Sequence, residues 1–337
     1  MHMADALLSP SVAIVMYATS ISAIGYAIHK IKEDELTEKR LPIMAVTGAL
    51  VFAAQMINFT IPGTGSSGHI VGGILLAALI GGYPALLTIA SVLIIQCLFF
   101  ADGGLLALGC NIFNMGVLPC LVAYPLVFKP LRQNGKHLAL ATILATVVGL
   151  QLGAFSVVLE TFVSGITELP FATFALLMQP IHLAIGIVEG IVTVAILRFV
   201  YQMRPEILIS AGQRAALASG VSLKKVIVAL TLITILVSGG LSIYASKNPD
   251  GLEWAIAKTT GSTELEAQGE VFSVSAALQK SLAVFPDYEI INANEKSIFQ
   301  SISLPGIIGS VLACTLVGAA GILLAKIKKW KRTVTNE

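Results

Sequence analysis

The first two residues of the chain carry nitrogen atoms that can bind one metal ion together. Met1 and His2 place a free amine, a peptide nitrogen and an imidazole in succession, so an ion can be held in two fused chelate rings. A histidine elsewhere can complete a tetragonal set, which suits Ni(II) or Cu(II) better than Mg(II) or Ca(II). His69 is the candidate because it follows an uncharged, glycine-rich segment at 63–68. From spacing alone, a histidine at position 2 is usually an accident, and a histidine at a helix start more often forms a hydrogen bond.

Several polar side chains could orient these ligands. A metal-bound imidazole usually donates its other N–H to a fixed acceptor. Asn111 and Asn114 are three positions apart and would share one face of a helix. The same groups could instead hydrogen-bond neighbouring helices, and the two interpretations have equal weight. The candidates for the supporting role are Asp5, Ser67, Asp102, Asn111 and Asn114.

His182 and Glu189 form a second polar pattern inside an apolar segment. They are seven positions apart and therefore lie on one face of a helix. An ionisable residue inside a membrane is by default a candidate functional residue. A transport-linked proton site is one interpretation, and a structural pair or a polar contact between helices is the one we favour. His29 and His137 flank basic clusters, and a position at the membrane surface accounts for both.

Composition indicates that the segments that position these residues lie in a lipid bilayer. Hydrophobic residues make up 56% of the chain, charged residues 12%, and the mean hydropathy is +0.87. A water-soluble domain of this length would carry more charge. No CxxC pair occurs, so Cys97, Cys110, Cys120 and Cys314 are interpreted as packing residues. The sequence predicts an all-α integral membrane protein.

Nine apolar segments are candidates for crossing the bilayer, which needs roughly 20 residues per helix. They lie near 10–29, 41–59, 70–82, 84–100, 105–128, 138–160, 171–198, 225–246 and 302–326. The third is short and, taken alone, could be re-entrant. We count it as a span because the distribution of basic residues requires an odd number of crossings between 70 and 128.

Lysine and arginine predict the orientation, because basic residues in short loops stay on the cytoplasmic side. Of the 21 basic residues, 17 fall in four clusters, at 30–40, 129–136, 198–225 and 326–332. The intervening segments 1–9, 60–69, 101–104 and 161–170 contain none. The pattern predicts nine crossings with the N-terminus outside and the C-terminus in the cytoplasm. A cleaved signal peptide is disfavoured because the start has no basic region and no cleavage site.

The loop at 247–300 holds eight acidic residues and four lysines. Its acidity could concentrate cations near a metal site, although a solvated surface would have the same composition. Ala45, Ala49 and Ala53 recur every four positions and form a smooth stripe that lets helices approach closely. The stripe could receive another helix of this chain or a helix of a partner.

Four separated motifs stand out: MHMADALLSP at the start, SGHIVGG at 67–73, FADGG at 100–104 with LGCNIFNM at 108–115, and HLAIGIVEG at 182–190. Together they resemble the CbiM/NikM family, the cobalt- and nickel-specific capture subunits of energy-coupling factor transporters. The start is similar to the family's MHIPDGFLSP. The segment NPDGLEW at 248–254 resembles the PDGLE motif of the small accessory subunit of these transporters, here fused to the same chain.

The resemblance implies seven helices in a capture part, 1–220, and two in an accessory part, 221–337, whose loop lies near the metal entrance. It places the metal on the Met1 amine, the amide and ring of His2, and His69. It also implies two ATPase subunits and one transmembrane coupling subunit, which would dock on the alanine stripe. Met3-Ala4 stands where the family has Ile-Pro, and Ala6 where it has Gly, which loosens the expected turn.

These observations predict uptake of nickel, or alternatively cobalt, across the cytoplasmic membrane of a prokaryote, with the ion as cargo and no permanent cofactor. Nickel is preferred because planar ligation by four nitrogens favours it over cobalt. A metal sensor or passive channel without ATPase partners remains an alternative. No P-loop and no HExxH motif occurs in the sequence, so we expect neither ATP hydrolysis nor metalloprotease activity by this chain. No nucleic-acid partner is expected.

Overall fold

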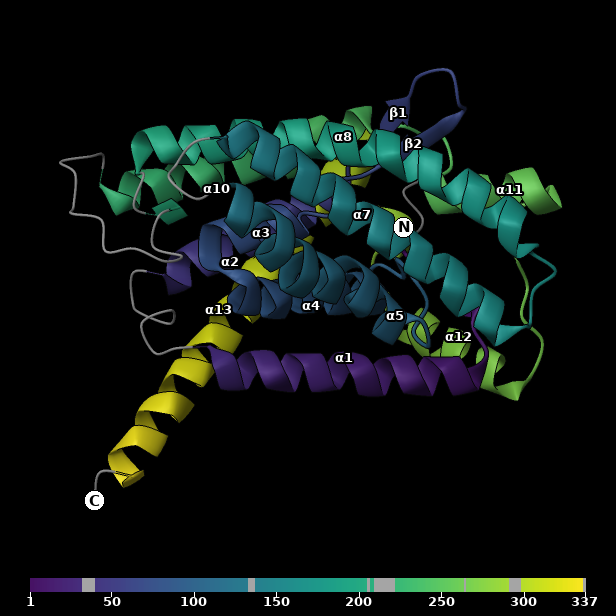
Figure 1. Cartoon of the computed structure of the whole chain (residues 1–337), viewed down its shortest axis with the longest axis horizontal. Helices are drawn as coiled ribbons and strands as arrows, with labels where there is room; N and C mark the ends of the chain where they lie inside the picture. Colours follow the sequence, from purple (N-terminus) through teal and green to yellow (C-terminus); the bar gives the residue numbers. More distant parts are fainter. Residues whose placement is uncertain are drawn as a thin grey trace.

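A computed structural model describes residues 1–31, 40–132, 137–204, 207–208, 222–263, 265–290 and 298–335, most of them helical (Figure 1). Several sequence predictions lie outside these residues: the boundary between 220 and 221 and the basic residues Lys32, Lys39, Lys136, Arg214 and Lys296.

Six of the described helices are long and apolar enough to cross a membrane. They are α1 (Pro10–Lys30), α4 (Gly82–Phe99), a continuous helix made of α5 (Leu108–Ile112), η3 (Phe113–Phe128) and α6 (Lys129–Leu131), α7 (Leu138–Ser164), α8 (Phe171–Met203) and α13 (Ile298–Thr335). Two shorter helices, α2 (Leu41–Gln55) and α10 (Leu223–Gly239), pack beside α13. The structure establishes a multi-pass helical architecture, and the count of nine crossings and their orientation stay predictions.

The predicted third span is a short, fully buried helix. α3 (Gly73–Ile80) has eight residues, a rise of about 12 Å at 1.5 Å per residue, against a hydrocarbon core of about 30 Å. Its start needs a glycine, because Gly72 has a φ of +80° and a Cβ there would lie 2.7 Å from the Val51 side chain. Gly81, with a φ of 90°, separates α3 from α4. A non-helical segment, 69–72, therefore enters the bundle just after His69.

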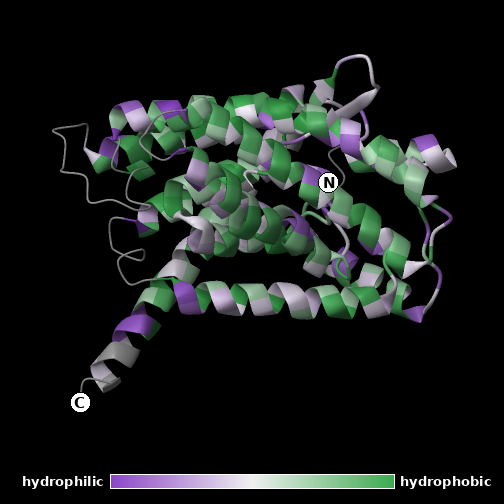
Figure 2. Ribbon diagram, in the orientation of Figure 1, coloured by the Kyte–Doolittle hydropathy of each residue, from purple (hydrophilic) through white to green (hydrophobic). Residues whose placement is uncertain are grey.

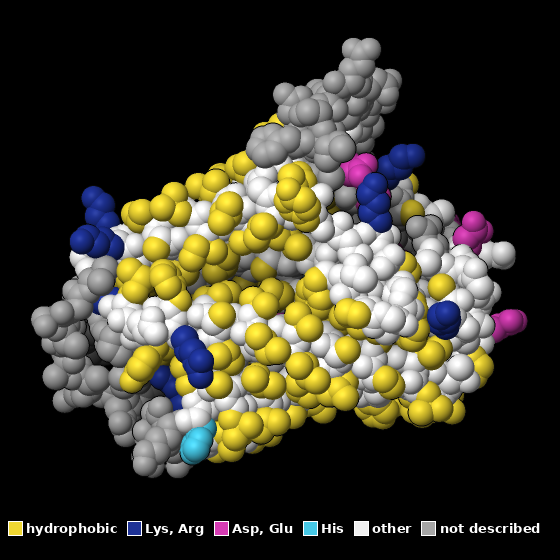
Figure 3. All heavy atoms as spheres, turned by 90° about the horizontal axis from the view of Figure 1, so that it is seen from above, with side chains coloured by type: hydrophobic (Ala, Val, Ile, Leu, Met, Phe, Trp, Pro, Cys, Tyr) yellow, Lys and Arg dark blue, Asp and Glu magenta, His cyan; other side chains and the backbone are white. Residues whose placement is uncertain are grey.

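The outer surface of the helical bundle is apolar (Figure 2). Leu176 of α8, Val163 of α7 and Leu232 of α10 are more than 60% exposed, as expected for side chains that face lipid. On the face shown in Figure 3, hydrophobic side chains cover the middle, and the Asp and Glu side chains that can be seen lie toward the right. At the opposite end of the bundle, the Lys328 ammonium of α13 donates to the Ile31 carbonyl. This contact joins the basic C-terminal ends of α1 and α13.

The accessory region contributes most of the remaining elements at the end of the bundle where the metal ligands lie. These are η4 (Leu241–Tyr244), α11 (Gly251–Thr260), α12 (Glu270–Leu282) and η5 (Pro286–Tyr288). A short hairpin of β1 (Phe59–Ile61) and β2 (Ser66–Gly68) pairs Phe59 with Gly68. The Ser67 amide donates to the Pro249 carbonyl at 2.8 Å, so the segment before His69 is bound to the segment before α11.

The alanine stripe is buried within this chain. Ala45, Ala49 and Ala53 are 9%, 5% and 0% exposed. A Cβ added at Gly318 of α13 would lie 3.6 Å from the Ala45 Cβ, so α13 packs directly against the stripe. This corrects the expectation of a docking surface for a partner and leaves the alternative, close packing between helices of one chain.

Candidate metal centre

The N-terminal segment enters the bundle and is held there by its backbone. Met1 and Met3 are 4% and 0% exposed. The Met3 amide donates to Asn111 Oδ1 at 2.7 Å, and Asn111 Nδ2 donates to the Met3 carbonyl at 3.2 Å. The Gly104 amide donates to the same carbonyl at 2.8 Å. Gly104 must be a glycine because a Cβ would collide with the Asp5 carboxylate. The segment is thus fixed on both sides of the residue that follows His2.

Three candidate ligand groups meet at this point. The Met1 amine lies 3.1 Å from His69 Nε2. The His2 and His69 rings are stacked, with centroids 5.1 Å apart and planes 23° apart. The Met1 amine and the two imidazole rings therefore lie side by side, within reach of one another.

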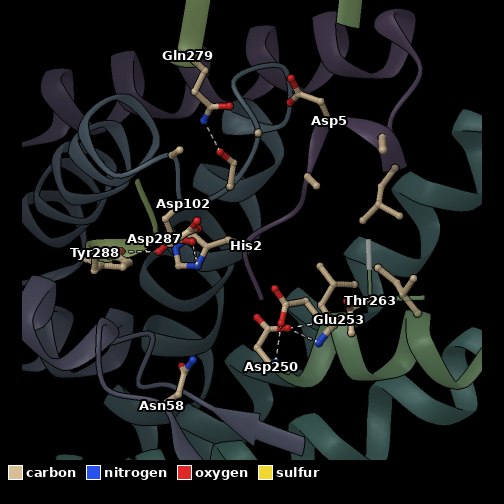
Figure 4. A pocket seen from close by; sticks show the side chains of 18 of the residues that line it. His2, Asp5, Asn58, Asp102, Asp250, Glu253, Thr263, Gln279, Asp287 and Tyr288 are labelled. Carbon is tan, nitrogen blue, oxygen red and sulfur yellow. Dashed lines mark hydrogen bonds and ion pairs between the residues drawn. The ribbon is translucent and has the colours of Figure 1, made fainter. Parts of the chain in front are cut away.

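The His2 ring has a polar partner at each nitrogen. Nδ1 lies 3.2 Å from Asp102 Oδ1, and Nε2 lies 3.3 Å from Gln96 Oε1. The Asp102 carboxylate also accepts a hydrogen bond from the Tyr288 hydroxyl at 2.5 Å, and the three labelled side chains lie together in Figure 4. Burial lowers the pKa of His2, although Asp102 opposes this. The ring is accordingly neutral near pH 7 and can offer a lone pair.

The amine is paired with a carboxylate of the accessory region. Asp250 Oδ2 lies 2.5 Å from the Met1 nitrogen, while Oδ1 accepts from the Leu252 and Glu253 amides and caps α11. Burial opposes ionisation of Asp250, yet the Met1 amine holds the pKa of this carboxyl well below its usual range. Burial and the nearby Asp250 charge raise the pKa of Glu253. An ion pair therefore joins the two parts of the chain at the site.

His69 is 6% exposed. Burial lowers its pKa well below the usual value, and the Met1 amine adds to the effect. Its Nδ1 lies 3.4 Å from the Ile70 carbonyl, a long contact that leaves the ring weakly oriented. The His69 ring that faces the amine is consequently neutral near pH 7.

A cavity of about 830 Å³ opens onto these groups. Its lining includes the His2 and His69 rings and carboxylates from four segments of the chain: Asp5, Asp102, Asp250, Glu253, Asp287 and Glu289. Such a cavity raises the local concentration of cations. Figure 4 shows Asp102 and Asp287 near His2, with Asp250 and Glu253 at the neighbouring wall.

The other predicted supporting residues have different partners. Asp5 accepts from the Ala107 amide at 3.0 Å and from the Ser275 hydroxyl at 2.7 Å. The Ser67 hydroxyl donates to the Asn248 carbonyl at 2.8 Å. Asn114 Nδ2 donates to Glu160 at 2.8 Å and lies 3.7 Å from Met3 Sδ. Of the five candidates, Asp102 contacts a proposed ligand side chain, Asn111 and Asn114 contact Met3, and Asp5 and Ser67 bind other segments.

His182 and Glu189 do not act on each other directly in this structure. His182 Nδ1 lies 2.8 Å from the Met178 carbonyl, and its Nε2 has no hydrogen-bond partner within the described part of the chain. Glu189 accepts from the Val71 and Gly72 amides, each at 2.9 Å. Glu189 thus binds the non-helical segment that follows His69. This is a polar contact between segments and not a pair of the two side chains, and the alternative, a transport-linked proton site, stays a prediction.

Sequence reasoning missed Asp250, Gln96, Tyr288 and Glu160 as neighbours of the site. Asp250 belongs to a recognised motif, but spacing could not show that it reaches Met1. Gln96 and Glu160 are polar residues in apolar segments, which is a usable signal. Nothing in the sequence singles out Tyr288. Among the residues that the structure describes, no three His, Cys, Asp or Glu side chains gather in one metal-binding cluster.

A multi-pass helical membrane protein with a buried, nitrogen-rich site at one end is the class that these observations define. The chain belongs to the family described as the cobalt uptake substrate-specific transmembrane region, whose model matches residues 2–207. A PDGLE domain matches residues 224–326. Both findings confirm the resemblance seen in the sequence.

Curated relatives carry names from metal transport. The putative fused nickel transport protein NikMN of Archaeoglobus fulgidus is 35% identical over 208 residues, 62% of this chain and 68% of that protein. The probable fused nickel transport protein LarMN of Lactiplantibacillus plantarum is 28% identical and covers 86% of this chain and 89% of its own length. The cobalt transport protein CbiM of Sorangium cellulosum is 30% identical, covering 62% of this chain and 94% of that protein.

A solved structure is also similar. A crystal structure described as a truncated transition metal transporter aligns with a TM-score of 0.53 and 28% identity, covering 59% of this chain and 98% of that one. The chain is therefore a multi-pass membrane protein of a family that takes part in metal uptake.

Proposed function

We propose that the chain captures nickel as the substrate-binding membrane subunit of an energy-coupling factor transporter. The observation that carries the proposal is the Met1 amine 3.1 Å from His69 Nε2, with the His2 ring stacked on His69. The amine, the His2 amide, His2 Nδ1 and His69 Nε2 form a tetragonal set of nitrogen ligands. A different contact holds each part: Asp250 binds the amine, Asn111 binds the Met3 backbone next to His2, and Asp102 binds the His2 ring. The segment at 69–72 positions His69.

Binding requires the site to lose protons and the His2 ring to turn. The amine gives up the proton that it shares with Asp250, and the His2 amide gives up its own. Nδ1 of His2 must leave Asp102 and face the amine, after which the other ring nitrogen can donate to a neighbouring oxygen. The released protons pass to water. The carboxylates of the acidic cavity attract the metal ion.

The accessory region is part of this function. Asp250 binds the amine, and the Asn248 and Pro249 carbonyls bind Ser67, two positions before His69. Both anchors of the site are therefore contacted by the region that matches the PDGLE domain. The proposed division is a capture part at 1–220 and an accessory part at 221–337 that holds the ligand groups in place for metal binding.

Energy and orientation come from outside the site. We assign ATP hydrolysis to two ATPase subunits and transmission to one coupling subunit, in the cytoplasmic membrane of a prokaryote. The acidic cavity would face outward, because the ends of α1 and α13 opposite it carry Lys30, Lys328 and Lys329. Co-purification of ATPase subunits with the chain from native membranes would support this arrangement. Transport of metal by the chain without such subunits contradicts it.

Cobalt is the alternative cargo, because the matching family is described by cobalt uptake. Two arguments favour nickel: the proposed four-nitrogen set with an ionised amide suits Ni(II) better than Co(II), and the two fused relatives reported above are both named for nickel. Uptake of labelled nickel in cells, with cobalt as competitor, separates the two. Nickel uptake that resists equimolar cobalt supports the assignment. Nickel uptake that cobalt suppresses overturns the preference for nickel. Equal loss of uptake in His69→Ala and in the remote control His29→Ala overturns the proposed site.

A further inference from the structure

Helix α12 is attached to the protein along one side. Gln279 Nε2 donates to the Gly103 carbonyl at 2.7 Å and to the Cys97 carbonyl at 3.0 Å. The Ser275 hydroxyl donates to Asp5 Oδ2 at 2.7 Å. Phe272, one turn before Ser275, lines the cavity with Gln279. These residues are spaced by three and four positions, so they form one face of the helix.

A second face of α12 is apolar and uncovered. Val271, Val274, Leu278 and Leu282 are 49%, 59%, 49% and 42% exposed. They recur at intervals of three and four positions and make a continuous stripe beside the attached face. Ser273 and Lys280 lie on the opposite, exposed side, where Ser273 stands at the open rim of the cavity. A stripe of this kind left in water would be unfavourable, and something apolar must cover it.

The contacts of α12 fix its depth relative to the membrane. Cys97 lies in the last turn of α4, and the Phe99 carbonyl at the end of α4 accepts from the Val284 and Phe285 amides at 3.0 Å each. Asp5 lies just before α1 begins at Pro10, and Figure 1 shows α12 near this end of α1. Two membrane-crossing helices therefore hold α12 at the level where they leave the hydrocarbon.

We propose that α12 is an interfacial helix whose apolar stripe binds the lipid leaflet on the side of the metal cavity. α12 lies near the start of α1, where Ile14 and Val15 are 69% and 61% exposed, as expected for side chains that face lipid (Figure 1). Amphipathic helices at this depth bury an apolar face at the boundary of headgroups and acyl chains. Glu270 and Lys280 balance each other on α12, so the binding is hydrophobic and does not require anionic lipid.

The proposal gives the lipid a structural role at the site. The same helix that carries the stripe also binds the Asp5 carboxylate of the N-terminal segment and the Gly103 carbonyl of the loop that contains Asp102. Lipid contact would hold this wall of the cavity in place. The proposal does not depend on which metal is bound or on transport.

The test uses the full chain in liposomes, with a fluorescent bimane on a single accessible cysteine. Cys97, Cys110 and Cys120 are buried, and Cys314→Ala removes the half-buried thiol. Val274→Cys places the label on the stripe, and its neighbour Ser273→Cys places it on the polar side. With phosphatidylcholine brominated in the acyl chains, we expect a blue-shifted emission and loss of fluorescence at 274, and neither at 273. The loss should be the same when phosphatidylglycerol is added.

A second pair keeps the test independent of one substitution. Leu278→Cys should behave as Val274→Cys, and Lys280→Cys as Ser273→Cys. Equal quenching at stripe and polar positions, or no quenching at either stripe position, overturns the proposal. The latter result would mean that protein or water, and not lipid, covers the stripe.

Discussion

The Asp250 carboxylate lies 2.5 Å from the Met1 amine, although 249 positions separate the two residues. One residue belongs to the segment that matches the PDGLE domain, and the other begins the segment that contains the proposed metal ligands. Asp250 is also the N-cap of α11 and closes a capping box with Glu253. The helix start and the N-terminus of the chain therefore share one carboxylate, which makes its position rigid.

Asp250→Asn should weaken nickel binding, because it removes a negative charge beside a ligand nitrogen while asparagine still caps α11. A metal-bound amine still has N–H groups that can donate to the carboxylate, and a hydrogen bond to a charged group contributes roughly 1.5–3 kcal/mol, or about a 10- to 150-fold loss of affinity when it is removed. Isothermal titration of the purified protein measures it. Glu253→Gln is the matched control, since it changes charge in the same cavity without touching the amine. An equal loss in both variants would show that only the net charge matters.

Nickel binding should release about two protons, one from the amine and one from the His2 amide. Burial lowers the pKa of His2 and of His69. Both rings are therefore already neutral above pH 7 and add no protons, and protonation competes with metal only at a pH below the usual imidazole range. Affinity should rise with pH between 7 and 8. Titrations in buffers of different ionisation enthalpy count the protons, and a count of zero would leave only imidazole ligation.

Glu189→Gln should loosen the segment that carries His69. The carboxylate accepts from two buried amides, Val71 and Gly72, and a Gln side chain can accept from only one with its oxygen. We expect a loss of about 2–4 kcal/mol in stability and weaker nickel binding. Thr193→Val, one turn away on α8, is the control, because its hydroxyl has no hydrogen-bond partner in the described structure. Thermal unfolding in detergent compares the two, and identical curves would contradict the assigned role.

Gly109→Ala should destabilise the contact between α1 and α5. A Cβ at Gly109 would lie 2.6 Å from the Tyr17 nitrogen and 2.8 Å from its Cα, so the backbones would have to separate. Overpacking of this kind costs about 1–3 kcal/mol. Gly25→Ala, in α1 itself, meets nothing within 4 Å and should be neutral or slightly stabilising. Unfolding midpoints of the two variants test this, and an unchanged midpoint for Gly109→Ala would count against close packing.

The long helices could be predicted from the sequence because a helix in lipid satisfies its own backbone. The expected segments 138–160 and 171–198 became α7, Leu138–Ser164, and α8, Phe171–Met203, with starts that agree and ends a turn further on. Hydropathy did not predict the length of α3, which has eight buried residues within the expected span at 70–82, and whether this segment crosses the bilayer stays a prediction. Its length is set by the glycines at 72 and 81 and by packing, which an average over apolar residues does not report.

The site was only partly accessible from the sequence. The first two residues and His69 carry their own chemical signal, and the structure brings all three together. Asp5 was expected beside the ligands and instead binds Ser275 of α12, because the turn of η1 (Asp5–Leu7) directs it toward the accessory region. The contact of Asp250 with Met1 depends on how two distant segments pack. No local pattern encodes such a contact.

The most direct test is the nickel complex of the purified chain compared with a form extended by one glycine ahead of Met1. The account predicts one tightly bound nickel ion, with the absorption of a planar four-nitrogen complex, for the chain that starts at Met1. The extended form should lose that spectrum and at least about 100-fold in affinity, because the amine is no longer next to the His2 amide. An extended form that keeps both would contradict ligation by the Met1 amine.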